Sequence, residues 1–202
     1  MNPITLQEDT LPFQTIVVDF IVKLPVSEGY DTIMTITDHD CMKAVILVPC
    51  NETIDAKGVA KLFKDQVFPF VGLPKHIISD RDTRFTSAFF KELCTQLGIK
   101  QNLSTAYHPQ TDGQSEKTNQ HVKTVLRIYC NHQQDNWAKV LPIVQYAINA
   151  WTSTTTKQAP YELWMGFIPR AHQPDQPSNV PAIERYKETI ITARRNAREA
   201  MK

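Results

Sequence analysis

Three acidic residues stand in surroundings where a carboxylate is unusual. Asp19 interrupts the apolar, β-branched run 16–22, where burial of a charge costs free energy unless something compensates it. Asp80 directly follows a short apolar run at 76–79, and Glu116 follows a glycine-containing polar stretch. Each has an ordinary structural alternative: a hydrogen-bonded aspartate, a turn or N-cap aspartate, and a first-turn glutamate favoured by the helix dipole. None of the three identifies a site by itself.

Together the three acids fit one chemical demand. Two divalent cations about 3.5–4 Å apart need several carboxylate oxygens that converge on one spot. Magnesium prefers hard oxygen ligands and keeps water positions that a phosphate can take. If the first and fourth strands pair in the centre of a sheet, Asp19 and Asp80 become neighbours, and the helix after the fifth strand can bring Glu116 to them.

The elements that would position these acids follow from the apolar periodicity. Strands are expected at 16–22, 30–37, 44–49, 76–79 and 99–103, and helices at 53–71, 86–97, 116–129 and 136–151. The polar stretch 104–115 is expected to be a mobile loop. Asp82 is expected to be a loop residue, and the three tryptophans are expected in the core: Trp137, Trp151 and Trp164. Three strands followed by alternating helices and strands predict an α/β fold: a five-stranded mixed sheet flanked by helices, in the order of ribonuclease-H-like domains. The predicted division is an N-terminal tail (1–12), this core (13–168), and a proline-rich linker with a basic C-terminal helix (169–202).

Composition limits the classes of protein that the sequence can represent. The four cysteines form no CxxC pair and the histidines supply no matching set, which argues against a structural zinc site. No apolar run reaches the roughly 18 residues of a membrane span, and the N-terminus lacks a signal-peptide core, so we expect an intracellular protein with no membrane partner. A net charge of +1 means that any grip on DNA depends on local patches or on further domains.

Longer segments carry a family resemblance. VVDFIVKLP, GLPKHIISDRDTRFTSAFFKELCTQLGIK and STAYHPQTDGQSEKTNQ resemble the integrase core of gypsy-class LTR retrotransposons and, more distantly, retroviral integrases. The resemblance runs from about residue 12 to residue 169, and the 35 residues at 81–115 match the D-D-35-E spacing of that superfamily. It implies that Asp19, Asp80 and Glu116 are the catalytic triad and hold two Mg²⁺ or Mn²⁺ ions. The implied reaction is DNA 3′-end processing followed by strand transfer.

The resemblance also implies where nucleic acid binds. The residues predicted to contact DNA are Tyr107, Gln114, Asn119, Gln120 and Lys123. The first two belong to a stretch that matches the family's active-site loop. The last three share a helix face with Glu116, and a solvated helix face is the alternative interpretation. The implied partners are element ends and target DNA, with RNA as a further nucleic-acid candidate and a homo-oligomer as the assembly. The nucleus is inferred from this substrate, because no basic targeting run is present.

Two readings compete with an active integrase core. Such integrases have an upstream His-His-Cys-Cys zinc domain and a downstream DNA- or chromatin-binding module; neither is in this sequence, which is therefore expected to be a fragment of a retrotransposon polyprotein. One alternative is another ribonuclease-H-like nuclease or a transposase. The other is a non-catalytic remnant that only binds nucleic acid or protein.

Overall fold

The sheet at the centre of the molecule has five strands in the order β3-β2-β1-β4-β5. The computed structural model describes residues 11–103, 109–170, 188 and 192, and the side chains among these except at 109–115. The strands are β1 (Thr15–Ile21), β2 (Thr32–Asp38), β3 (Val45–Cys50), β4 (His76–Ser79) and β5 (Lys100–Leu103). The first three form an antiparallel meander, and β4 and β5 continue it in parallel with β1. The predicted five-stranded mixed sheet is confirmed.

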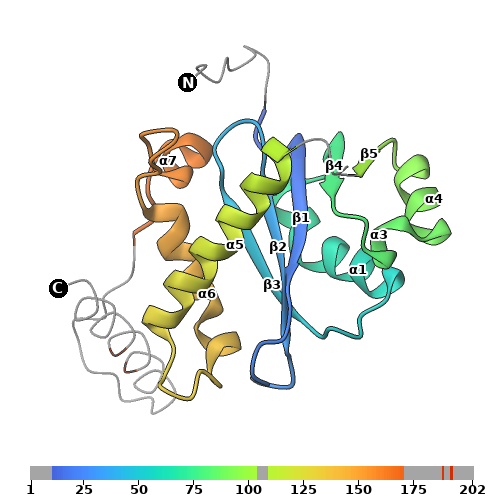
Figure 1. Cartoon of the computed structure of the whole chain (residues 1–202). Coiled ribbons are helices and arrows are strands. Elements are labelled where there is room, and N and C mark those ends of the chain that lie inside the picture. The colour runs from blue at the N-terminus through green and yellow to red at the C-terminus, as the bar shows by residue number, and fades with distance from the viewer. Residues whose placement is uncertain (1–10, 104–108, 171–187, 189–191, 193–202) are drawn as a thin grey trace.

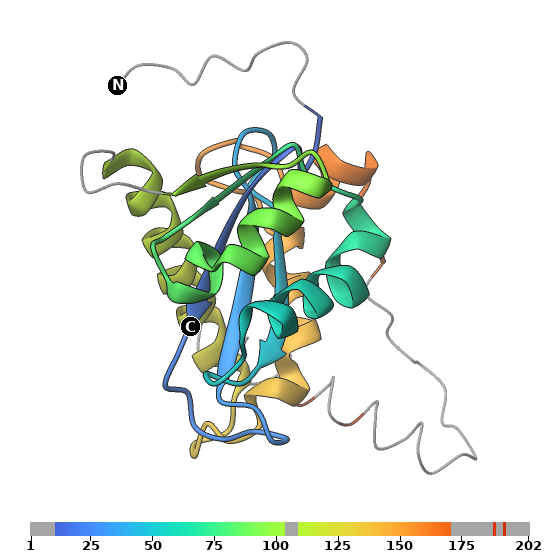
Figure 2. The same cartoon turned by 90° about the vertical axis from the view of Figure 1, so that its right-hand side faces the viewer.

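Helices cover both faces of this sheet (Figures 1 and 2). One face carries α1 (Ala56–Leu62), the π-helical turn η1 (Phe63–Val67), α2 (Phe68–Val71), α3 (Thr83–Thr86) and α4 (Ala88–Gln96). The opposite face carries α5 (Pro109–Tyr129) and α6 (Trp137–Ala150), and α7 (Pro160–Met165) lies next to α6. The helix expected at 53–71 is thus present but is interrupted by the π turn.

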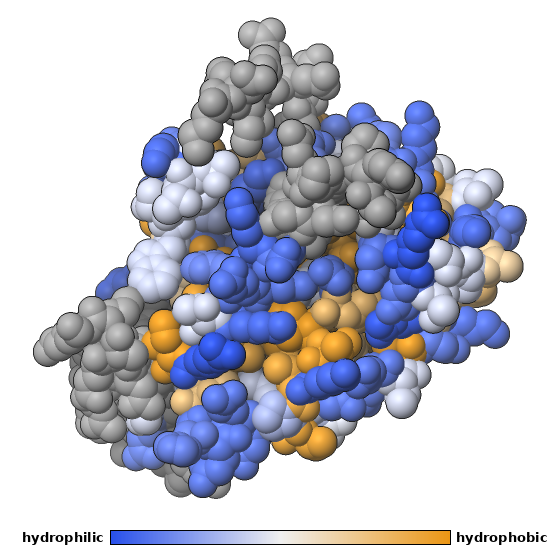
Figure 3. Space-filling model, viewed as in Figure 1, coloured by the Kyte–Doolittle hydropathy of each residue, from blue (hydrophilic) through white to orange (hydrophobic). Residues whose placement is uncertain are grey.

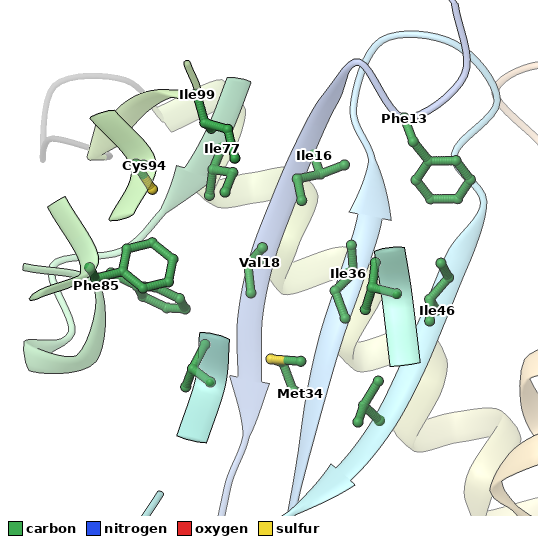
Figure 4. Close-up of a cluster of buried hydrophobic side chains, with 14 of the residues drawn as sticks. Phe13, Ile16, Val18, Met34, Ile36, Ile46, Ile77, Phe85, Cys94 and Ile99 are labelled. Carbon is green, nitrogen blue, oxygen red and sulfur yellow. The ribbon is translucent and has the colours of Figure 1, made fainter. Parts of the chain in front are cut away.

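Two apolar layers hold the helices on the sheet. Figure 4 shows the first, in which Ile16 and Val18 of β1 pack with Ile77 and Phe85. In the second layer, Ile21 and other strand residues pack against Val125 of α5 and against α6. Side chains alternate between the faces of a strand, so the odd-numbered residues of β1 face α5. Asp19 is one of them.

The free edge of β3 is closed by two side chains of α6. Asn149 accepts a hydrogen bond from the Val45 N–H through Oδ1 and donates one to the Val45 carbonyl through Nδ2, both at 2.8 Å. Gln145, one turn earlier, accepts from the Leu47 N–H at 2.8 Å. Unpaired strand edges invite pairing with other chains, and here side chains satisfy the outward backbone groups instead. This contact fixes α6, and with it α5, against the sheet.

Two predictions about local structure are wrong. Residues 109–115 were expected in a loop, but α5 already begins at Pro109. Proline suits the first position of a helix because its φ is preset and its missing N–H would have no intrahelical partner there. Trp151 was expected in the core, but it is 47% exposed, because α6 ends there with extended backbone. Residues 104–108 and nearly all of 171–202 lie outside the described residues; Glu188 and Thr192 are described, and both are helical.

In the described part of the chain, no helix combines the length and the apolar character needed to span a membrane.

Candidate active site

Two of the three predicted acids lie where the parallel pairing of β1 with β4 ends: Asp19 is still within β1, and Asp80 directly follows β4. The pairing between β1 and β4 ends with Val18 opposite Ser79. The next residue along the sequence is Asp19 in the first case and Asp80 in the second. Asp19 is partly buried, whereas Asp80 is exposed. The carboxyl ends of adjacent parallel strands are where α/β sheets commonly bind ligands. The sheet order therefore brings together two acids that are 61 positions apart in the sequence.

The electrostatics of Asp19 reflect this proximity. Burial raises the pKa of its carboxyl above the ordinary 3.8, and the negative charge of Asp80 raises it further. The backbone N–H of Phe20, which donates to Oδ1 at 2.7 Å, acts in the opposite direction, as do Asn119 and the charge of Lys123. The net result, set mainly by burial, is a pKa of Asp19 above its ordinary value. A cation between the two carboxylates would stabilise the ionised form of both.

Helix α5 supplies a direct partner for Asp19. The amide Nδ2 of Asn119 donates a hydrogen bond to Asp19 Oδ2 at 2.8 Å. The hydroxyl of Thr35, on β2, lies 3.1 Å from Asn119 Oδ1 and 3.2 Å from the carbonyl oxygen of Asp19, both of which can accept its proton. Asn119 was predicted to contact DNA, and the structure shows it in contact with an acid of the site. Thr35 was not singled out, because threonine is an ordinary β-strand residue.

The turn after β4 holds Asp80 in place. The N–H of Asp82 donates to Asp80 Oδ1 at 3.0 Å. Asp82 in turn accepts hydrogen bonds from Nε and Nη2 of Arg84, at 2.8 and 2.5 Å, and these bonds lower the pKa of its carboxyl. The guanidinium of Arg84 also stacks over the ring of Phe20, 3.7 Å from its centroid. Asp82 was expected to be a plain loop residue, but its carboxylate also caps α3.

Glu116 does not form a metal-binding cluster with Asp19 and Asp80 in this structure. It is an exposed residue of α5, one helical turn before Asn119. Among the described residues, no three His, Cys, Asp or Glu side chains lie close enough together to hold a metal ion. A third carboxylate beside Asp19 and Asp80 would be repelled by both. The membership of Glu116 in the site stays a prediction that rests on its position in the sequence and on its proximity to Asn119.

The remaining predicted DNA contacts are only partly described. Gln120 and Lys123 are exposed on α5, and the charge of Lys123 acts on Asp19. Tyr107 lies outside the described residues, and so does the side chain of Gln114. The face of the molecule that carries α5 is mostly hydrophilic, with apolar side chains exposed lower in the same view (Figure 3).

The donor set at the site suits magnesium. Asp19 and Asp80 offer carboxylate oxygens, the hard ligands that Mg²⁺ prefers, and the exposure of Asp80 leaves room for water or phosphate. The two aspartates therefore fit the chemistry of the expected ion.

The sheet order and the helices on both faces define a ribonuclease-H-like domain of the integrase core type. A family model described as "Integrase core domain" matches residues 9–109, which is half of the chain and includes Asp19 and Asp80. The chain belongs to this integrase core domain family.

Relatives and solved structures agree with this assignment. The chain is 35% identical over 167 residues to the Transposon Tf2-3 and Tf2-4 polyproteins of Schizosaccharomyces pombe, a match that covers 83% of this chain. The match spans only 12% of the length of those polyproteins.

Two solved viral structures share the fold. One is the HTLV-2 integrase catalytic core domain in complex with magnesium, with a TM-score of 0.60 and 18% identity over 76% of this chain and 97% of that one. The other is a simian T-cell lymphotropic virus intasome in complex with PP2A regulatory subunit B56 gamma, with a TM-score of 0.62 and 21% identity over 90% of this chain and 63% of that one.

Proposed function

We propose that this chain is the catalytic core of a gypsy-class LTR retrotransposon integrase, which trims the 3′ ends of element DNA and joins them to target DNA. The observation that carries the proposal is the juxtaposition of Asp19 and Asp80 at the point where the parallel pairing of β1 and β4 ends. Family membership and the similarity to the Tf2 polyproteins support it. Element DNA, target DNA, a homo-oligomeric assembly and action in the nucleus are parts of this proposal.

In the proposed reaction, Asp19, Asp80 and Glu116 would hold two Mg²⁺ or Mn²⁺ ions. When bound, such ions would supply Lewis acidity to the attacking oxygen and to the leaving 3′ oxygen of a phosphodiester. The protein supplies position and charge for two successive displacements, first by water and then by the freed 3′-hydroxyl. Lys123, exposed and close enough to act on Asp19, would neutralise phosphate charge next to the acids. Glu116 would reach the site by a change of side-chain conformation from its position on α5.

A disintegration assay with the 202-residue chain tests the proposal. A branched DNA that mimics the strand-transfer product is incubated with Mg²⁺ or Mn²⁺, and release of the element strand is followed on a gel. The wild-type chain should show metal-dependent release, and Asp19→Asn, Asp80→Asn and Glu116→Gln should each abolish it. Glu92→Gln is the matched control, because Glu92 is an exposed acid of α4 on the opposite face of the sheet.

Each outcome has a clear meaning. Wild-type activity that persists in one of the three variants removes that acid from the site. A folded wild-type chain that binds branched DNA but never releases a strand contradicts the proposed reaction and favours a non-catalytic, nucleic-acid-binding role.

A further inference from the structure

Thr35 and Asn119 form a hydrogen-bonded chain that ends on the carboxylate of Asp19. We propose that both are positioning residues: Thr35 selects the orientation of the Asn119 amide, and Asn119 then holds the Asp19 carboxylate in a metal-binding conformation. The link to metal binding rests on the proposed function. The hydrogen-bonded chain itself does not.

Three separate elements must meet to form this chain of contacts. Thr35 is the residue of β2 that pairs with Asp19 of β1, so the two are adjacent across the sheet. The Thr35 residue is only 2% exposed, which leaves its hydroxyl few alternative partners. Asn119 reaches the same point from α5, 84 positions further along the sequence than Thr35. The hydrogen-bonded chain therefore forms only when α5 is packed against β1 and β2.

The chemistry of the three groups allows only one orientation when Asp19 is charged. A carboxylate can only accept hydrogen bonds, whereas an amide has one donating end and one accepting end. In the observed orientation Nδ2 of Asn119 faces Asp19 and Oδ1 faces the hydroxyl of Thr35. Rotation of the amide by half a turn would place Oδ1 against a negative oxygen. The Thr35 hydroxyl has one proton and two acceptors within reach, Asn119 Oδ1 and the carbonyl oxygen of Asp19. When it donates to Oδ1, it stabilises the productive orientation and, by polarising the amide, strengthens the hydrogen bond of that amide to Asp19.

The result is an Asp19 carboxylate held at both oxygens. The Phe20 N–H binds Oδ1 at 2.7 Å and the Asn119 amide binds Oδ2 at 2.8 Å. Each carboxylate oxygen has about two lone pairs, so one on each oxygen stays available for a cation. Groups that orient a metal ligand in this way commonly change metal affinity or activity by about 10- to 100-fold when they are removed.

Three substitutions separate a positioning role from general disturbance of the strand. Thr35→Val keeps the size and β-branching but removes the hydroxyl, and Thr35→Ser keeps the hydroxyl. Thr37→Val is the matched control, because Thr37 is a buried threonine two residues along the same strand and on the same face. All three are made in the 202-residue chain.

Two measurements are compared across these variants. The first is the side-chain amide signal of Asn119 in ¹⁵N–¹H NMR spectra of the metal-free chain, assigned by its loss in Asn119→Ala. The second is the Mg²⁺ dissociation constant from calorimetry. We expect Thr35→Val to shift the amide signal and to weaken Mg²⁺ binding by about 10-fold or more. Thr35→Ser should retain the wild-type signal and affinity, as should Thr37→Val.

The proposal is overturned if Thr35→Val leaves the amide signal and the affinity unchanged, or if Thr37→Val perturbs both to the same extent. A shifted amide signal with unaltered Mg²⁺ affinity would also overturn the positioning role. A wild-type chain that fails to act on DNA while the amide signal and the Mg²⁺ affinity respond as expected would refute the proposed function and leave the positioning role supported.

Discussion

Replacement of Asn149 by leucine should destabilise the fold strongly, because this side chain closes the edge of β3. Asn149 is fully buried and binds both the N–H and the carbonyl of Val45. It also hydrogen-bonds the phenol of Tyr161. Leucine has the same number of side-chain heavy atoms in the same branched arrangement but offers no donor or acceptor. The substitution Asn149→Leu therefore removes the partners of two backbone groups without leaving a large cavity.

The size of the effect follows from those two groups. A buried donor or acceptor left without a partner costs about 1–3 kcal/mol, so two cost about 2–6 kcal/mol. Burial of the leucine side chain returns about 1.5–3 kcal/mol at most. These two ranges give a net loss centred on about 2 kcal/mol and reaching up to about 4.5 kcal/mol in the free energy of unfolding, a large part of the roughly 5–15 kcal/mol that a domain possesses.

Urea denaturation followed by circular dichroism measures this loss as a lower midpoint at an unchanged slope. Gln145→Leu is the matched control on the same helix face: Gln145 is only partly buried and serves one N–H, that of Leu47, so its loss should cost about 1 kcal/mol. If Asn149→Leu is within about 0.5 kcal/mol of the wild type, the range of ordinary surface substitutions, the edge-closing role of Asn149 is refuted.

Three further predictions concern charge at the site and hydrogen bonding elsewhere in the fold. Arg84 lowers the pKa of Asp82, so their pairing stabilises the fold above the unfolded-state pKa of about 3.8, and this stabilisation is lost as the pH falls through the lower folded-state pKa. The difference in unfolding free energy between the wild type and Asp82→Asn, measured by urea titration, should therefore shrink below about pH 4. A difference that stays constant down to about pH 2 would contradict the pairing. Burial and the charge of Asp80 both raise the pKa of Asp19, which means that the ionised carboxylate destabilises the metal-free fold. Asp19→Asn removes this charge and should therefore melt at or above the wild-type temperature in metal-free calorimetry. A clearly lower melting temperature would show that the Asp19 carboxylate does not destabilise the fold. Trp137→Phe removes the hydrogen bond from Nε1 to the Pro25 carbonyl (2.6 Å) and should cost about 1–3 kcal/mol in urea unfolding, whereas an unchanged midpoint would show that this bond adds nothing.

Much of the architecture could be predicted from local patterns. The run around Asp19 is apolar on both sides, which indicates a central strand and marks the acid as exceptional. Pairing of the first and fourth strands was the condition under which Asp19 and Asp80 become neighbours, and the parallel pairing of β1 and β4 meets it. Once these strands pair, Asp19 and Asp80 are neighbours, because each directly follows the last paired residue of its strand.

The contacts around these acids could not be predicted in the same way. Thr35 occupies a strand where threonine is common, so its type carries no signal about a hydrogen bond to α5. Asn149 and Val45 are 104 positions apart, and nothing local shows that a helix side chain will serve a strand edge. The start of α5 at Pro109 was missed because the following residues are polar and include Gly113, which are features of loops as well.

Crystals of the 202-residue chain soaked in Mn²⁺ would test the central claim most directly. We predict an anomalous difference peak that both Asp19 and Asp80 coordinate, with oxygen–metal distances of about 2.0–2.1 Å, as expected for an Mg²⁺-type site. Glu116 should turn toward a second ion in the same crystals. Peaks that appear only elsewhere on the surface, with the Asp19 and Asp80 carboxylates free of metal, would contradict the assignment of these acids as the metal-binding core of the site.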